Sequence, residues 1–283
     1  MLVLVNTASG TMSRAAERER LRALLPQAKF VELSDGARIS DVIEGEGSEV
    51  VVAAGGDGTV SAVAARIAGT ARALGVIAGG TLNHFAKDLG VPQDLEGAAA
   101  VIRAGKTKQV DIGEVNGRTF INNSSIGLYV EIVREREKYR KHGLRKWTAF
   151  AAAVVETLAH WPMVKVRLEI EGKAVERRTP FVFLGNNRYR MDGLRMGSRD
   201  RLDEGQLCML AARRLSRWGL ARMAVAGLTG GLHHSENLDI LCAQDVLVKT
   251  KRRVQVALDG EVVRMSAPLH YRVRPGELKV IAP

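Results

Sequence analysis

Short apolar runs and helically spaced apolar positions alternate along the first hundred residues. Strands are predicted at residues 2–5, 30–33, 50–54 and 74–78. Helices are predicted at residues 13–25, 60–67, 82–89 and 95–103, with Ser13 expected to cap the first of them. The run 50–54 is apolar at every position, as in a parallel strand that is covered on both faces. Strand, turn and helix repeated in this order predict a parallel α/β sheet.

Beyond about residue 110 the pattern changes to that of antiparallel strands. Asn116-Gly117 lies between two apolar runs and is a strong signal for a two-residue hairpin. Residues 164–170 alternate between apolar and charged side chains, which predicts a half-exposed strand. Further strands are predicted at residues 181–184, 207–211, 246–248, 254–258, 262–265, 269–273 and 278–281. Helical insertions are predicted at residues 144–161 and 216–229, so this half is expected to be a β-sandwich with two helical interruptions.

The change of pattern predicts two domains. Residues 1–115 are expected to form an α/β domain with a parallel sheet, and residues 116–283 an antiparallel β-sandwich. The last predicted strand is expected to be able to return to the first domain.

Composition narrows the class of protein. The 283 residues carry 42 Lys and Arg against 31 Asp and Glu, a net charge of +11 that favours polyanionic partners or simply a soluble basic protein. No apolar run reaches the roughly 18 residues of a membrane-spanning helix, and no signal peptide is recognisable. Cys208 and Cys242 indicate neither a disulfide framework nor a metal site. A cytoplasmic location is therefore expected.

A glycine-rich turn is expected between the strand at 50–54 and the next helix. It reads Gly55-Gly56-Asp57-Gly58-Thr59, and residues without a Cβ let the backbone approach phosphate oxygens closely. The helix that follows directs its unpaired N–H groups to the same place. Neither a P-loop lysine nor a dinucleotide GxGxxG spacing is present, and an ordinary βα turn is the alternative.

Two further polar turns follow predicted parallel strands, at residues 6–10 and 79–83. The carboxyl ends of neighbouring parallel strands share one crevice, so the three turns are expected to converge on a nucleotide.

These motifs together resemble the diacylglycerol kinase catalytic-domain family, which includes sphingosine kinases and soluble bacterial lipid kinases. GGDGT is similar to the family's most specific motif, and GTLNHFA at residues 80–86 to its GTxNDFA motif. LDGE at residues 258–261 resembles the late acidic motif, and residues 6–10 resemble NPxSG, with Thr7 in place of proline. The order and spacing fit nearly the whole chain. The resemblance implies an N-terminal ATP-binding domain and a C-terminal sandwich that receives a lipid, with ATP as co-substrate and Mg²⁺ as cofactor.

The resemblance also implies roles for individual residues. ATP contacts are expected from Asn6, Ser9, Gly10, Gly55, Gly56, Asp57, Gly58, Thr59, Gly80, Thr81 and Asn83. Glu261 is expected to be the general base, with Asp57 as its rival, and Asp57, Asp111 and Asp259 are candidate ligands of the catalytic Mg²⁺. Residues 201–206 resemble a structural Mg²⁺ loop, with Glu204 and the carbonyls of Arg201 and Gln206 as ligands, and a solvated turn is the alternative.

One departure keeps other functions open. His84 stands where the family usually has Asp, so a catalytically silent nucleotide-binding or lipid-binding regulator is retained beside the kinase. An NAD kinase-like enzyme is a second alternative, because it shares the GGDG motif.

The basic segments 134–147 and 213–222 contain tryptophans, which favours an anionic membrane surface as partner and transient binding at the inner face of the membrane. A solvated helix face packed on its own domain is the alternative for each segment. No nucleic-acid-binding module is recognised, and a homodimer is left open.

Overall fold

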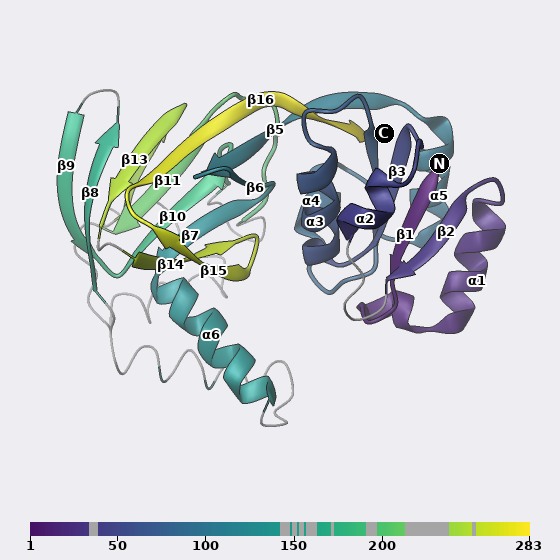
Figure 1. Ribbon diagram of the computed structural model, residues 1–283, viewed down its shortest axis with the longest axis horizontal. Coiled ribbons are helices and arrows are strands. Elements are labelled where there is room, and N and C mark those ends of the chain that lie inside the picture. The colour runs from purple at the N-terminus through teal and green to yellow at the C-terminus, as the bar shows by residue number, and fades with distance from the viewer. Residues whose placement is uncertain are drawn as a thin grey trace. The chain divides into compact units, whose positions relative to one another are not determined.

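The apolar runs of the N-terminal segment form a parallel sheet. The protein is represented by a computed structural model that describes residues 1–33, 39–141, 148, 152, 156, 163–170, 173–190, 197–212, 238–250 and 253–283. The first strands are β1 Leu2–Asn6, β2 Lys29–Leu33, β3 Val50–Gly55 and β4 Ala73–Ala78, and the strand β16 Leu269–Ile281 joins them from the end of the chain. Their order is β2-β1-β3-β4-β16, and the pairs among them are parallel (Figure 1).

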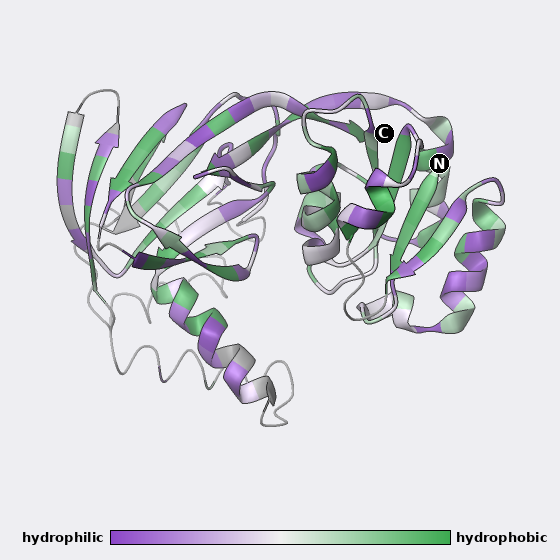
Figure 2. Cartoon of the chain, viewed as in Figure 1, coloured by the Kyte–Doolittle hydropathy of each residue, from purple (hydrophilic) through white to green (hydrophobic). Residues whose placement is uncertain are grey.

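Helices connect these strands. They are α1 Ala15–Leu24, α2 Ile39–Glu44, α3 Asp57–Ile67, α4 His84–Asp88 and α5 Leu95–Ala104, with a 3₁₀ helix at Gly10–Ser13. In the sheet, β1 and β3 are hydrophobic along almost their whole length, whereas much of α1 is hydrophilic (Figure 2). Helix α3 buries the predicted stripe of Val60, Val63, Ala64 and Ile67. Helix α3 therefore supplies part of the apolar cover that a parallel sheet requires.

Two predicted helix details are wrong. Ser13 does not cap α1, because its hydroxyl donates to the carbonyl of Gly10 at 2.7 Å and closes the 3₁₀ turn instead. The helix predicted at 82–89 is shorter, since Asn83 adopts a left-handed backbone conformation with φ of 51° and the helix begins only at His84.

The second half of the chain forms mainly antiparallel strands, as predicted. These are β5 Thr107–Val115, β6 Arg118–Phe120, β7 Asn123–Gly127, β8 Val164–Ile170, β9 Lys173–Thr179, β10 Phe181–Asn186, β11 Leu207–Ala212, β12 Leu238–Ala243, β13 Asp245–Lys249, β14 Arg253–Leu258 and β15 Glu261–Ser266. The helix α6 spans Leu128–Lys141. One antiparallel sheet has the order β12-β11-β10-β7-β14-β15, and β16, β13, β8 and β9 follow one another in the other sheet.

Both sheets contribute to one apolar core in this half. Val166 and Leu168 come from β8, Val182 and Leu184 from β10, and all four are buried. Tyr271 of β16 is buried among them, and its hydroxyl hydrogen bonds with that of Ser124 at 3.0 Å. Burial raises the pKa of the Tyr271 phenol, so the side chain stays neutral at physiological pH. Two facing sheets around a shared core confirm the predicted sandwich.

Several elements differ from the prediction. Strands β7 and β12 and helix α6 were not expected, and the two strands predicted at 269–273 and 278–281 are the single strand β16. The helical insertions predicted at 144–161 and 216–229 lie outside the described residues, apart from three positions of the first. None of the described helices has the length and apolar character needed to cross a membrane.

The interpretation of the cysteines is also wrong. Cys208 of β11 and Cys242 of β12 face each other in register and form a disulfide, with their Cα atoms 4.1 Å apart. Strand pairing brings together two residues that are 34 positions apart in sequence, and spacing alone does not reveal this.

The chain divides into two compact units. The first consists of Met1–Ile112, Arg201–Gly205 and Arg274–Pro283, and the second of Gly113–Asp200 and Gln206–Val273. The first unit therefore draws on three separate parts of the sequence, including the last ten residues.

Candidate functional site

Three turns of the first unit come together at the carboxyl ends of β1, β3 and β4. The Gly79 amide donates to the Gly55 carbonyl at 2.8 Å, and the Thr11 amide donates to the Gly79 carbonyl at 3.0 Å. The side-chain amide of Asn6 donates to the Thr59 hydroxyl at 2.9 Å, which ties the turn after β1 to the first turn of α3. The convergence predicted from the parallel sheet is therefore present.

The glycines at this point allow the backbones to approach closely. A Cβ on Gly80 would lie 2.7 Å from the Cα of Gly56, and one on Gly10 would lie 2.2 Å from the carbonyl oxygen of Gly79. Gly10 also has a φ of +33°, which side-chain-bearing residues rarely adopt. Backbone rather than side chains thus forms the floor of this site.

The amino end of α3 opens onto the same turns. The amides of Asp57 and Gly58 have no acceptor within the helix, because they belong to its first turn. Gly56 precedes the helix and has no side chain that could cap it. Gly58 is exposed and Asp57 is half-buried. No described residue hydrogen bonds with the Asp57 carboxylate. An 11-residue helix thus presents its positive end and free donors beside one available acid.

Asn83 stabilises the third turn from within. Its side-chain oxygen accepts from the Gly80 amide at 2.9 Å, and its nitrogen donates to the Gly80 carbonyl at 3.2 Å. The side chains of Thr81 and His84 are exposed on this turn, and that of Ser9 is half-buried on the neighbouring one. Asn83 therefore shapes the turn, and Thr81 is an exposed residue of it.

Asp259 lies in the second unit, in the turn between β14 and β15. One of its carboxylate oxygens accepts the amides of Asn122 and Asn123 at 2.8 and 3.0 Å, and the other accepts that of Ile121 at 2.9 Å. Asp259 has a φ of 47°, and its own amide donates to the Asn123 carbonyl at 2.9 Å. Glu261 follows at the start of β15 with its side chain exposed. The turn that carries Glu261 is thus anchored by Asp259.

A buried arginine contacts the same segment. Arg199 is 3% exposed, and its guanidinium donates to the Ile121 carbonyl at 2.7 Å and to the Asn122 side-chain oxygen at 2.7 Å. It also donates to the Asn186 carbonyl at 3.0 Å and lies 5.2 Å from the centre of the Tyr189 ring. Sequence reasoning did not single out Arg199, because no motif surrounds it and its partners are mostly backbone atoms.

Asp111 has a similar anchoring position in the first unit. Its side chain is almost fully buried, and its two carboxylate oxygens accept the amides of Gly205 and Gly276 at 2.7 and 2.9 Å. Its own amide donates to the Leu202 carbonyl at 2.7 Å. Asp111 thus joins β5 to the segments Arg201–Gly205 and Arg274–Pro283, which reach the first unit from later in the sequence.

Two residues of the expected structural Mg²⁺ loop, Arg201 and Gln206, form hydrogen bonds within the protein. The Arg201 side chain donates to Asp203 at 3.0 Å, and this bond lowers the pKa of the Asp203 carboxyl. The Gln206 carbonyl accepts the Asn187 amide at 2.9 Å, and Glu204 is exposed. Among the described residues, no three His, Cys, Asp or Glu side chains gather into a group that could hold a metal ion.

Two protein families match this chain. Residues 1–115 match the diacylglycerol kinase catalytic domain, and residues 125–282 match the YegS C-terminal NAD kinase beta sandwich-like domain. The second match alone covers more than half of the chain.

Relatives and solved structures agree with these matches. The diacylglycerol kinase of Bacillus subtilis (strain 168) is 29% identical over 190 residues, which are 66% of this chain and 62% of that protein. The diacylglycerol kinase of Staphylococcus aureus (strain bovine RF122 / ET3-1) is 28% identical over 190 residues, 66% of this chain and 59% of that protein. The chain thus spans less than two thirds of the length of these relatives.

Similarity to solved structures extends over the whole chain. A diacylglycerol kinase structure from Bacillus anthracis str. Sterne matches with a TM-score of 0.72 and 19% identity, covering 100% of this chain and 96% of that one. A second structure from the same organism matches with a TM-score of 0.78 and 23% identity, covering 100% and 94%. At these identities the likeness shows the shared fold.

Proposed function

The chain belongs to the diacylglycerol kinase catalytic-domain family, and from this membership we propose that it is an ATP-dependent lipid kinase. It transfers the γ-phosphoryl group of ATP to a lipid hydroxyl, with a diacylglycerol-like lipid as substrate. The observation that carries the proposal is the meeting of three polar turns at the free amino end of α3. Backbone donors and a helix dipole in one place are suited to a polyphosphate.

ATP binds along these turns in the proposed arrangement. The backbone of residues 55–59 contacts the phosphates, since Gly55, Gly56 and Gly58 have no Cβ that would keep phosphate oxygens at a distance. Thr81 adds an exposed hydroxyl, while Asn6 and Asn83 hold their turns in place through the hydrogen bonds described above. Ser9, Gly10 and Gly80 complete the backbone surface.

A divalent cation, Mg²⁺ in this proposal, neutralises phosphate charge when it is bound. Asp57 fits that ion best, because its carboxylate is half-buried at the turn and no described residue hydrogen bonds with it. The carboxylates of Asp111 and Asp259 each accept two or three backbone amides, so their main role is to anchor chain segments. The structural Mg²⁺ loop at Arg201, Glu204 and Gln206 stays a prediction.

Glu261 is the general base in this mechanism. Its exposed carboxylate takes the proton of the lipid hydroxyl while the hydroxyl oxygen forms a bond to the γ-phosphorus. The bond between that phosphorus and the β,γ-bridging oxygen breaks, and ADP leaves. Asp259 keeps the Glu261 turn in position by accepting hydrogen bonds from the amides of residues 121–123. Arg199 contacts the same segment by donating a hydrogen bond to the Ile121 carbonyl.

The lipid substrate also implies where the protein works. A diacylglycerol-like molecule stays in a bilayer, so the enzyme must contact an anionic membrane surface, which its charge of +11 favours. Transient binding at the inner face of the membrane follows as part of the proposal.

Transfer of labelled phosphate from ATP to vesicles tests the function. Vesicles that contain diacylglycerol are compared with vesicles that contain sphingosine and with NAD in solution. We expect labelling of diacylglycerol; labelling of NAD alone would favour an NAD kinase-like enzyme, and ATP binding without any transfer would favour a regulator.

Two variants test the assigned roles. Asp57→Ala and Glu261→Ala are each expected to reduce turnover at least a hundredfold, as removal of a positioned acid or base does. Glu44→Ala is the matched control, since Glu44 is exposed on α2. Full activity of either site variant would overturn that residue's role.

A further inference from the structure

The exposed face of β8, β9 and β13 carries an unusual arrangement of like charges. In the β8–β9 ladder Lys165 lies directly opposite Arg178, and in the β13–β8 ladder Lys249 lies directly opposite Arg167. All four side chains are exposed, and they alternate along the strands with buried residues such as Val166 and Leu168. Like charges directly opposite each other destabilise a sheet, so this pattern needs a compensating partner.

Acids on the same face neutralise one of the two pairs. Glu169 accepts from Lys249 at 2.7 Å and lies 3.2 Å from Arg167, and Glu176 lies 3.9 Å from Arg167. The hydrogen bond from Lys249 lowers the pKa of the Glu169 carboxyl, so this acid stays ionised at neutral pH. Arg167 and Lys249 are therefore already paired with carboxylates.

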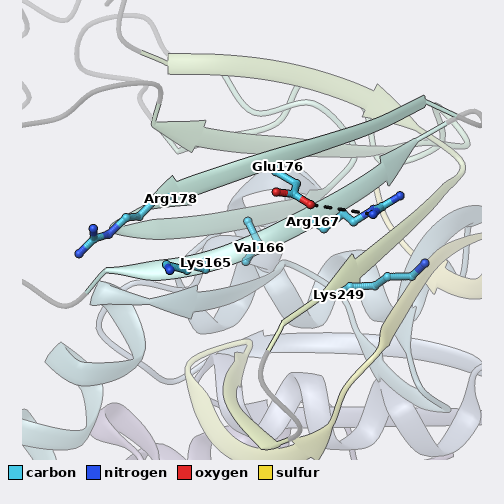
Figure 3. Close-up of a pocket in the computed structure, with 6 residues that line it drawn as sticks. All are labelled: Lys165, Val166, Arg167, Glu176, Arg178 and Lys249. Atoms are coloured by element: carbon cyan, nitrogen blue, oxygen red, sulfur yellow. Dashed lines mark ion pairs between the residues drawn. The ribbon is translucent and has the colours of Figure 1, made fainter.

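The other pair lacks such acids. Within the described part of the chain, no ion pair involves Lys165 or Arg178. Both residues line an open pocket of about 450 Å³ together with Val166, Arg167, Glu176 and Lys249. In Figure 3, Lys165 and Arg178 lie at one end of this pocket, and the ion pair between Arg167 and Glu176 lies toward the other.

We propose that this pocket binds a phosphate group, which Lys165 and Arg178 contact directly. The planar guanidinium of Arg178 is suited to two phosphate oxygens at once, and the Lys165 ammonium supplies a second, mobile charge. A bound dianion removes the repulsion between the two cations. The remaining volume of the pocket admits more than a phosphate alone, which fits a phosphate ester.

Two kinds of molecule carry such a group: an anionic phospholipid in a membrane and a water-soluble phosphate ester. The proposal concerns the phosphate chemistry that they share. It does not rest on the proposed kinase activity, because every residue of this pocket lies in the second unit and the test measures binding.

The double variant K165Q/R178Q tests the site. Its matched control is R118Q/R264Q, which removes the same charge from exposed arginines on β6 and β15, strands that do not pair with β8 or β9. Binding of inorganic phosphate is measured by calorimetry without ATP. Binding to vesicles of phosphatidylcholine, with and without phosphatidic acid, is measured by sedimentation at low and moderate salt.

We expect K165Q/R178Q to bind at least tenfold more weakly than the control variant in one or both assays. A loss only with phosphatidic acid vesicles identifies a lipid headgroup as the ligand, and a loss only with inorganic phosphate identifies a soluble ester. Equal binding by the two double variants in both assays would overturn the site. Phosphate transfer to a detergent-dispersed lipid is expected to be unchanged in K165Q/R178Q, and this separates the pocket from the proposed kinase.

Discussion

Substitution of Asp259 tests whether the turn before Glu261 is held by the contacts described above. Asp259→Ala removes the acceptor of three backbone N–H groups, those of Ile121, Asn122 and Asn123. A donor left without a partner costs about 1 to 3 kcal/mol, and the lower end applies because water reaches this half-buried site. Three donors then amount to about 3 kcal/mol. Alanine adds about 1 kcal/mol, because it tolerates a left-handed backbone poorly.

Asp259→Asn separates the hydrogen bonds from the backbone effect. Asparagine accepts a left-handed conformation readily, and its side-chain oxygen can keep the bonds to the amides of Asn122 and Asn123. Its NH₂ group then faces the Ile121 amide, which is also a donor, so one bond is lost. We expect Asp259→Asn to destabilise the protein by about 1 to 2 kcal/mol, between the wild type and Asp259→Ala.

Urea denaturation followed by circular dichroism gives the free energies of unfolding. Asp200→Ala is the control, because it removes an exposed acid that pairs only at the surface with Arg190, and it should change stability by less than about 1 kcal/mol. If Asp259→Ala were no less stable than the control variant, the carboxylate would not anchor the turn and the structural argument would fail. Activity plays no part in this measurement, so a catalytic role of Asp259 does not affect it.

Two further predictions concern close packing and cross-linking. Gly80→Ala should destabilise the first unit by about 1 to 3 kcal/mol and weaken ATP binding, because the new Cβ would lie 2.7 Å from the Cα of Gly56. Gly47→Ala is the control, because a Cβ there has no atom within 4 Å, and it should leave stability unchanged in the same urea titration. Reduction of the Cys208–Cys242 disulfide should lower stability by up to about 4 kcal/mol for a closed loop of 34 residues. The C208A/C242A variant should match the reduced wild type and not respond to reductant; an identical urea midpoint for oxidised and reduced wild type would contradict this.

Much of the fold could be predicted because hydrophobic patterning marks it locally. The stripe from Val60 to Ile67 and the apolar run of β3 identify their elements without knowledge of any partner. Strand β7 could not be found in this way, since it reads Asn-Ser-Ser-Ile-Gly and buries Ser124 and Ser125. Ser124 is accepted in the core because the Tyr271 hydroxyl is there to pair with it, and that contact spans 147 residues.

The candidate site could likewise be predicted only in part from the sequence. Glycines and the parallel sheet predict where the three turns of the first unit meet, because chain direction alone brings strand ends to one edge. The sequence does not distinguish an acid that is available to a ligand from one that anchors backbone. Asp57 and Asp111 look alike in a motif, and only the amides of Gly205 and Gly276 set them apart.

The path of β16 has a consequence for synthesis of the protein. Its last residues pair with β4, at Lys279 with Ala73 and Val280 with Leu74, and residues 274–283 belong to the first unit. On the ribosome, the sheet that bears the glycine turns therefore lacks its neighbour at the β4 edge until the second unit has been translated. We expect the first unit to complete its sheet only after the second unit has been translated, and to need protection at the β4 edge until then.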